Sequence, residues 1–122
     1  MIPQQLHHAS FVVRDIEASR RFYAGVLGLE EIERPPFPFE GAWYRVGQAE
    51  IHLIVPPSGL DVGSAPPGLN PLARHTAFAI DDYVKARDAL KAKGVEVLET
   101  NPEAGQMWVR DPDGNILEFI VP

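Results

Sequence analysis

The sequence predicts an α+β fold made of two tandem βαβββ modules, and three observations support this prediction. The order strand, helix and three strands occurs twice. Residues of the same type recur at nearly constant spacing in the two halves. A segment rich in Pro and Gly separates the halves. We therefore expect one domain over residues 1–122, with module 1 at 1–55, a linker at 56–72 and module 2 at 73–122.

Module 1 is expected to open with a strand over residues 6–13, because apolar side chains partly alternate there. Asp15 can cap a helix over residues 16–27, and Gly28 is typical of a helix end. The remaining strands are expected at residues 29–34, 42–46 and 50–55, with a tight turn at Gly47 and Gln48 between the last two.

Module 2 repeats this order. A strand over residues 74–80 precedes a cap near Asp81 or Asp82 and a helix over residues 84–93, which Gly94 ends. The remaining strands are expected at residues 95–99, 106–110 and 115–121, with a hairpin turn over residues 111–114.

Individual residues also follow the repeat. His8 is as far from His75 as His52 is from Glu118, to within one position. Further pairs keep nearly the same offset: Phe11 with Phe78, Val13 with Ile80, Asp15 with Asp82, Trp43 with Trp108, and Arg45 with Arg110. Agreement at this many positions indicates that the two halves are copies of one structural unit.

Composition and charge narrow the possible functions. The chain has 122 residues, of which 45% are hydrophobic, as in domains with a packed core. Its net charge of -6 and its lack of a Lys/Arg cluster argue against binding to nucleic acid or to an anionic membrane. Because it has no cysteine, any metal site must use nitrogen and oxygen ligands. No export signal or membrane-spanning stretch is present, so we expect a cytoplasmic protein.

Matching strands of the two modules carry four residues with metal-binding side chains: His8, His52, His75 and Glu118. Side chains alternate between the faces of a strand, and in each strand these residues are out of phase with the bulky apolar ones. Taken singly, each is explained as an ordinary strand residue paired with a neighbour or with solvent. Taken together, the four are best explained by convergence on one metal ion, since polar groups inside a curved sheet need partners.

Three imidazoles and one carboxylate suit a divalent ion such as Zn, Ni, Fe, Co or Mn, and affinity order alone does not choose among them. Four protein ligands leave one or two positions open if the ion is five- or six-coordinate, as a Lewis-acid site requires. A closed tetrahedral zinc would instead be structural.

A Pro-rich loop over residues 35–41 carries two phenylalanines, Phe37 and Phe39. Two interpretations are open. The two rings fold back onto the domain or onto a dimer contact, or they cover an apolar substrate like a lid.

Two pairs of residues each share a face of one strand: Trp43 with Arg45, and Trp108 with Arg110. One interpretation is that they line a substrate cavity with an aromatic wall and an anion-binding guanidinium. The other is that the tryptophans pack on the sheet while the arginines lie at its rim or pair with acids.

The motifs along the chain resemble the vicinal oxygen chelate superfamily, which includes glyoxalase I, extradiol dioxygenases, fosfomycin-resistance proteins, methylmalonyl-CoA epimerase and bleomycin-binding proteins. The resemblance rests on LHHA at residues 6–9, the run over residues 15–29 with FY and LGL, HTAF at 75–78, and DPDGN at 111–115 followed by Glu118. It spans the whole chain.

The resemblance implies an open, cupped barrel around a divalent metal, formed by paired modules and usually found in a homodimer with sites near the interface. His8 matches the first-strand ligand, His75 the fifth-strand ligand and Glu118 the eighth-strand ligand. His52 falls at the fourth-strand position, where glyoxalase I usually has Glu. If modules are exchanged between subunits, His8 and His52 come from one chain, and His75 and Glu118 come from the other.

The resemblance also implies a small-molecule substrate and leaves three functions open. A glyoxalase I-like isomerase or lyase would stabilise an enediolate-type intermediate, with Glu118 as the base. An extradiol-type dioxygenase would hold Fe(II) with His8, His75 and Glu118. A bleomycin-resistance-like protein would bind a small molecule without turnover.

Overall fold

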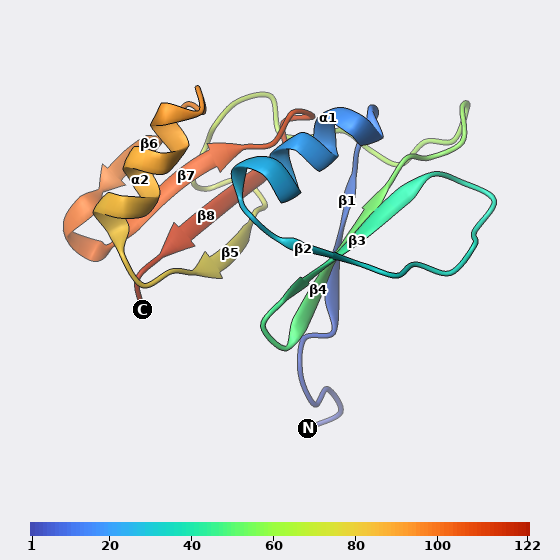
Figure 1. Ribbon diagram of the computed structural model, residues 1–122, viewed down its shortest axis with the longest axis horizontal. Coiled ribbons are helices and arrows are strands. Elements are labelled where there is room, and N and C mark those ends of the chain that lie inside the picture. Colours follow the sequence, from blue (N-terminus) through green and yellow to red (C-terminus); the bar gives the residue numbers. More distant parts are fainter. The chain divides into compact units, whose positions relative to one another are not determined.

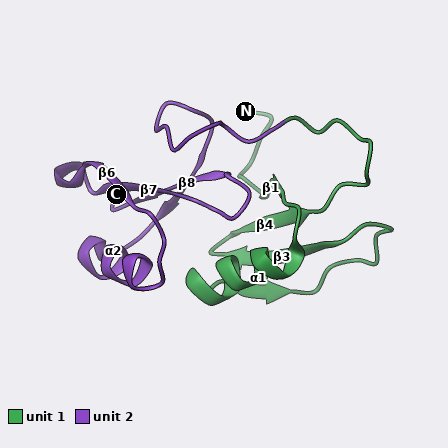
Figure 2. Cartoon of the chain, turned by 90° about the horizontal axis from the view of Figure 1, so that it is seen from above, with its two compact units in different colours: residues 1–63 green, residues 64–122 purple.

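A computed structural model describes residues 1–122 (Figure 1). The chain divides into two compact units, residues 1–63 and residues 64–122 (Figure 2). Unit 1 contains β1 (His8–Val12), α1 (Ile16–Arg20), η1 (Arg21–Val26), β2 (Glu30–Ile32), β3 (Gly41–Val46) and β4 (Ala49–Ile54). Unit 2 contains β5 (Thr76–Ala79), α2 (Tyr83–Ala92), β6 (Leu98–Asn101), η2 (Pro102–Ala104), β7 (Gln106–Arg110) and β8 (Ile116–Ile120). The predicted α+β class and the repeated βαβββ order are confirmed.

Both units have a four-stranded sheet with the same topology. The strand order is β1-β4-β3-β2 in unit 1 and β5-β8-β7-β6 in unit 2. In each sheet the first strand of the unit pairs in parallel with the last, and the other pairs are antiparallel. In unit 1 this arrangement sets β1, with His8, directly beside β4, with His52. In unit 2 it sets β5, which begins just after His75, beside β8, with Glu118.

The core of unit 1 lies between the sheet and its helix. Tyr23 is fully buried, and its ring centroid lies 6.0 Å from that of Phe11 and 6.0 Å from that of Tyr44. Val13 and Leu53, from the same face of the sheet, are also fully buried. Each such side chain contributes about 1.5–3 kcal/mol through burial. The bulky residues of β1 therefore pack against the helix, as alternation predicts, and His8 lies on the other face of the sheet.

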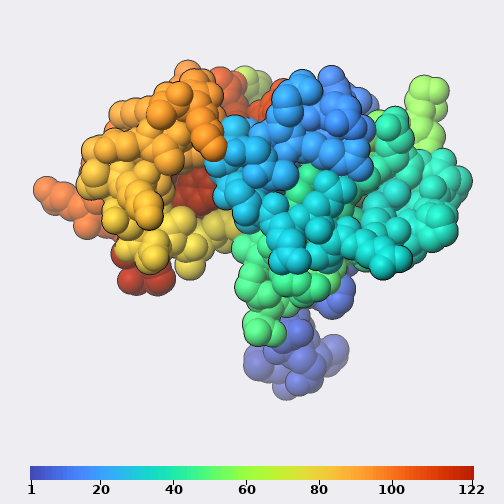
Figure 3. All heavy atoms as spheres, in the orientation of Figure 1, coloured from blue at the N-terminus to red at the C-terminus, as the bar shows by residue number.

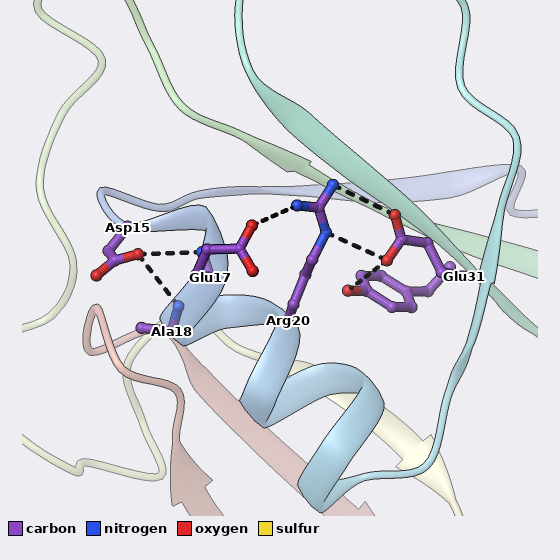
Figure 4. A network of polar contacts seen from close by, with 6 residues as sticks. Asp15, Glu17, Ala18, Arg20 and Glu31 are labelled. Carbon is purple, nitrogen blue, oxygen red and sulfur yellow. Dashed lines mark hydrogen bonds and ion pairs between the residues drawn. The ribbon is translucent and has the colours of Figure 1, made fainter.

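An arginine on the helix ties the edge strand of unit 1 to the core. Arg20 Nη1 lies 2.7 Å from Glu17 Oε1, and Arg20 Nε lies 3.3 Å from Glu31 Oε1 on β2 (Figure 4). Glu31 Oε1 also accepts a 3.4 Å hydrogen bond from the hydroxyl of Tyr44. Burial, reinforced by the Glu31 charge, raises the pKa of Tyr44 to about 12. The hydroxyl therefore stays protonated and available as a donor.

Unit 2 makes the same connection with different residues. Glu99 on the edge strand β6 accepts hydrogen bonds from the Tyr83 hydroxyl at 2.9 Å and from Lys91 Nζ at 3.1 Å, both on α2. Burial, followed by the contact with Glu99, raises the pKa of Tyr83 to about 12. An acidic edge-strand residue thus anchors to the helix in both units.

The segment predicted as one helix over residues 16–27 is divided, so this prediction is wrong in part. Asp15 caps α1 as expected, by accepting from the backbone N–H groups of Glu17 and Ala18 (Figure 4). From Arg21 to Val26 the chain forms a π-helix, and the Leu27 N–H donates to the Phe22 carbonyl five residues back. The wider turn buries Phe22 and its neighbour together, and this packing outweighs α-helical hydrogen bonding.

Two predicted strands have shifted boundaries in unit 2. The strand expected at residues 95–99 is observed at Leu98–Asn101, because the Val95 N–H donates instead to the Leu90 carbonyl and closes the helix. The strand expected at residues 74–80 begins only at Thr76. His75 therefore lies just before β5.

The last hairpin is stabilised by Asp111, in agreement with its predicted turn role. Asp111 Oδ1 accepts from the backbone N–H groups of Asp113 and Asn115, both at 2.9 Å, and Oδ2 accepts from the Asn115 side chain at 2.8 Å.

No helix in the structure combines the length and apolar character needed to cross a membrane.

Candidate functional site

Three aromatic rings stack across the sheet face of unit 1 that lies opposite the helix. Trp43 on β3 is directly opposite His52 on β4 in the strand register. Their ring centroids are 3.8 Å apart with planes 2° from parallel, and His8 on β1 stacks on the other side of His52 at 3.9 Å and 16°. His52 is consequently 94% buried, with 6% exposed, although it faces away from the helix. Two of the four predicted ligands are therefore in contact.

Glu50 orients His52 from the same strand. Residues two apart on a strand share a face, and Glu50 Oε1 lies 2.9 Å from His52 Nε2. The hydrogen bond with His52, followed by nearby positive charge, lowers the pKa of Glu50. A carboxylate bonded to one imidazole nitrogen leaves the other nitrogen free, an arrangement typical of metal-binding histidines.

His8 has a comparable arrangement with its neighbour in the chain. His8 Nδ1 lies 2.9 Å from His7 Nδ1, which leaves His8 Nε2 free of protein partners. Partial desolvation, followed by the charges of His52 and His7, lowers the pKa of His8, while Glu50 acts in the opposite direction. This environment favours the neutral imidazole, which is the form that binds metals.

Unit 2 brings together the other two predicted ligands. His75 Nε2 lies 3.2 Å from Glu118 Oε1, and Glu118 is 5% exposed. His75 Nδ1 lies 2.7 Å from the Ala73 carbonyl oxygen. The other carboxylate oxygen, Glu118 Oε2, accepts a 3.0 Å hydrogen bond from the Gln106 side chain. Backbone and side-chain partners thus fix the orientation of both groups.

The chemistry of this pair fits a bound cation. A carbonyl oxygen only accepts hydrogen bonds, so Nδ1 of His75 must carry a proton. In the neutral ring Nε2 then has a lone pair, and this lone pair faces an oxygen of Glu118. The Nε2 lone pair and the carboxylate oxygen are both hydrogen-bond acceptors and cannot bond to each other. A proton or a metal cation between them would bind both. The donor set of one imidazole nitrogen and one carboxylate oxygen suits a divalent metal.

Trp108 occupies the position in unit 2 that Trp43 occupies in unit 1. It is opposite Glu118 in the strand register, and its ring meets that of His75 edge-on at 4.8 Å and 85°. Trp108 is 6% exposed, and its indole N–H is buried without a hydrogen-bond partner. A buried donor without a partner is costly, so this group is available to a ligand oxygen.

The other candidate lining residues differ in their surroundings. Arg45 and Arg110 are both exposed, and Arg110 Nη2 lies 3.6 Å from Glu96 Oε1. Phe37 and Phe39 stack on each other within their loop, and Phe37 also contacts Trp43 on β3, so both interpretations of the loop stay open. Trp43 packs on the sheet face through its stack with His52.

The structure therefore pairs His8 with His52 in one unit and His75 with Glu118 in the other. No group of three or more His, Cys, Asp or Glu side chains is close enough to hold a metal ion. Shared coordination by all four residues stays a prediction.

Sequence reasoning missed Glu50 and Gln106 as partners of the predicted ligands. Strand alternation places Glu50 on the same face as His52, so this partner was accessible to the same argument. Gln106 lies two residues from Trp108 on β7 and is therefore on the face of Glu118, but its hydrogen bond depends on a side-chain reach that sequence does not specify.

Comparison with known proteins agrees with these features. The model of the Glyoxalase/Bleomycin resistance protein/Dioxygenase superfamily matches residues 5–119. The chain belongs to this superfamily. The resemblance inferred from its motifs is thereby confirmed.

Relatives within the superfamily cover almost all of the chain. A protein named glyoxylase I 4 from Arabidopsis thaliana is 30% identical, over 93% of this chain and 68% of its own length. A protein named lactoylglutathione lyase from Haemophilus influenzae is 32% identical, over 95% of this chain and 91% of its own length. The crystal structure of a glyoxalase family protein from Bacillus anthracis superimposes with a TM-score of 0.82 at 27% identity, covering 99% and 97% of the two chains.

Proposed function

We propose that this protein is a divalent-metal-dependent, glyoxalase I-like isomerase or lyase that acts on a small oxygenated molecule. The observation that carries the proposal is the His75–Glu118 pair, in which the imidazole Nε2 lies 3.2 Å from an oxygen of a buried carboxylate. Superfamily membership and the similarity to a protein named lactoylglutathione lyase support the same function.

The proposed ligands are His8, His52, His75 and Glu118, taken from both units of one chain or of two chains paired in a homodimer. Each histidine has one ring nitrogen held by a neighbour, namely His7, Glu50 or the Ala73 carbonyl, and presents the other to a ligand. A divalent ion such as Zn, Ni, Fe, Co or Mn would polarise the oxygens of the substrate.

Glu118 is the proposed base. As a carboxylate it removes a proton from the carbon next to a substrate carbonyl and returns the proton to the adjacent carbon, so the reaction is an isomerisation without net redox change. Gln106 holds one of its oxygens and leaves the other beside His75, which orients the group for this transfer. His52 occupies the matching position in unit 1, but its imidazole, with Nε2 bonded to Glu50, cannot replace the carboxylate as both metal ligand and base.

Metal analysis of the purified protein and of four variants tests the proposal. His8→Ala, His52→Ala, His75→Ala and Glu118→Ala should each lose metal and activity toward hemithioacetals together. Val84→Ala, an exposed position on α2, is the control and should lose neither. Absence of turnover and of substrate-proton exchange with Ni, Zn or Co restored would refute the isomerase. Ligand binding that survives loss of His8 and Glu118 would instead indicate a binding protein.

One observation favours a second candidate, an extradiol-type dioxygenase. His52 is sandwiched between the rings of Trp43 and His8. A ring enclosed on both faces suits a residue that lies beside the metal, which would leave His8, His75 and Glu118 as a two-histidine, one-carboxylate set for Fe(II). This candidate predicts oxygen uptake with catechols under Fe(II), and flat oxygen traces across a catechol panel would eliminate it.

A further inference from the structure

The loop between β2 and β3 of unit 1 is held in one shape by its own residues. Pro35, Pro36 and Pro38 restrict the backbone, and the Phe37 N–H donates to the Pro35 carbonyl at 2.9 Å. Figure 3 shows this segment at the surface, in turquoise. Phe37 is 44% exposed even though its ring contacts other aromatic rings. A restrained loop that presents an apolar ring to solvent calls for a physical explanation.

Arg34 clamps both phenylalanines of the loop. Its guanidinium carbon lies 5.1 Å from the ring centroid of Phe37 and 5.0 Å from that of Phe39, within the range of a cation–π contact. Arg34 Nη2 also donates a 2.6 Å hydrogen bond to the Phe39 carbonyl. A Cβ at Gly41 would lie 2.9 Å from Arg34 Nε and would collide with the Leu53 carbonyl, so glycine is needed beside the clamp.

The clamped rings continue the aromatic stack of the candidate site. Phe37 and Phe39 are 5.3 Å apart with planes 12° from parallel, and Phe37 lies 6.2 Å from Trp43. Trp43 in turn stacks on His52 at 3.8 Å. A row of aromatic rings therefore leads from the partly exposed Phe37 to a proposed metal ligand, all within unit 1.

We propose that Phe37, Phe39 and Trp43, here called the aromatic platform, bind a flat, uncharged aromatic group of the substrate. The inference rests on the proposed function of the site and names the substrate class. Rings fixed in advance favour a planar partner, because stacking then costs little ordering. A cationic group is disfavoured by the guanidinium of Arg34 beside the same rings. The restraints on the loop indicate a preformed surface, whereas a lid would have to move.

Two 2-hydroxy acids with the same oxygen atoms test the platform. Mandelate carries a phenyl ring where lactate carries a methyl group, and calorimetry on the Zn-loaded protein measures both dissociation constants. We expect mandelate to bind about tenfold more tightly, since each aromatic contact corresponds to roughly a two- to tenfold change. Phe37→Ala should remove most of this preference and leave lactate unchanged. Val84→Ala, the matched exposed apolar position on α2, should alter neither.

Phe37→Leu provides a second variant that keeps apolar bulk but lacks a flat face. In this variant, the logarithm of the ratio between the lactate and mandelate dissociation constants should fall to less than half of its wild-type value. An unchanged ratio would show that bulk alone matters and would overturn the proposal. Equal binding of mandelate and lactate to the wild type would overturn it as well.

A metal-free arm separates this inference from the proposed function. 2-Naphthol has no pair of vicinal oxygens, so its binding to the metal-free protein reports on the platform alone. Binding that weakens in Phe37→Ala supports the platform even if metal analysis fails. No 2-naphthol binding, together with metal-dependent binding of both acids at equal affinity, would refute the platform and preserve the metal site.

Discussion

The two units share one sheet topology and one arrangement of strands but place different chemistry at the same position. In unit 1 the residue opposite the tryptophan is His52, and its ring lies in a parallel stack. In unit 2 it is Glu118, a buried carboxylate with His75 beside it and Trp108 edge-on to that histidine. The difference shows that a duplicated scaffold fixes where side chains lie, whereas each sequence decides whether that place favours flat rings or charge.

The largest expected effect is on kcat, and it distinguishes Glu118 from His52 by their acid–base chemistry. Glu118→Gln keeps the shape of the side chain but removes the base, so kcat should fall by about 10²–10⁴-fold. His52→Gln, the matched change in unit 1, should weaken metal binding without an equal loss of kcat at saturating metal. Activity and metal content measured on the same samples check both expectations. Similar losses of kcat in the two variants would contradict the assignment of the base to unit 2.

The second largest expected effect compares how much the last hairpin turn of each unit contributes to the stability of the protein. Asp111→Ala leaves the backbone N–H groups of Asp113 and Asn115 without their acceptor, so the free energy of unfolding should fall by about 2–3 kcal/mol. In unit 1 the two-residue turn places Gly47 at φ 57°, and Gly47→Ala should cost only about 1 kcal/mol. Urea denaturation of both variants measures these changes. A larger loss at Gly47 would reverse the expected order.

A smaller effect tests the orientation of His52. Glu50→Gln removes the negative charge beside His52 Nε2 while keeping a hydrogen-bonding group. Loss of such a partner typically costs about 10–100-fold in metal affinity, which competition with a chelator measures. In unit 2, Gln106→Ala removes the neutral partner of Glu118 and should have a weaker effect on metal affinity. Unchanged affinity in Glu50→Gln would show that this carboxylate does not support a ligand.

The smallest effect concerns pH and the edge strand of unit 2. The hydrogen bonds from Tyr83 and then Lys91 lower the pKa of Glu99 in the folded protein. The stabilisation is therefore complete above the pKa of the unfolded chain, near 4.5, and is lost as pH falls through the lower folded value. Glu99→Gln should be less stable than wild type at pH 6, and the gap should shrink toward pH 3 in thermal unfolding. A gap that stays constant with pH would contradict this.

Much of this structure follows from simple sequence rules. Alternation correctly places Phe11 and Val13 on the helix face and His8 on the other, and Asp15 and Asp111 act as the cap and turn residues that their positions predict. These features depend on local geometry, which short stretches of sequence determine.

The features that sequence did not predict depend on contacts between distant segments. The π-helix at Arg21–Val26 exists because Tyr23 packs with rings from β1 and β3. The late start of β6 follows from the backbone bond between Val95 and Leu90. Alternation also selects the four proposed metal ligands, but the hydrogen bond between Glu118 and Gln106 depends on a side-chain conformation that a strand pattern does not encode.

The position of Arg34 and its two phenylalanines on a connection between strands has an evolutionary consequence. The proposed ligands of unit 1 come from β1 and β4, whereas the rings lie between β2 and β3. Substitutions in this connection therefore leave the strands of the proposed ligands untouched. Under the proposed function, a lineage descended from this protein could change what it binds by exchanging one short surface segment, while keeping the strands that carry the proposed ligands.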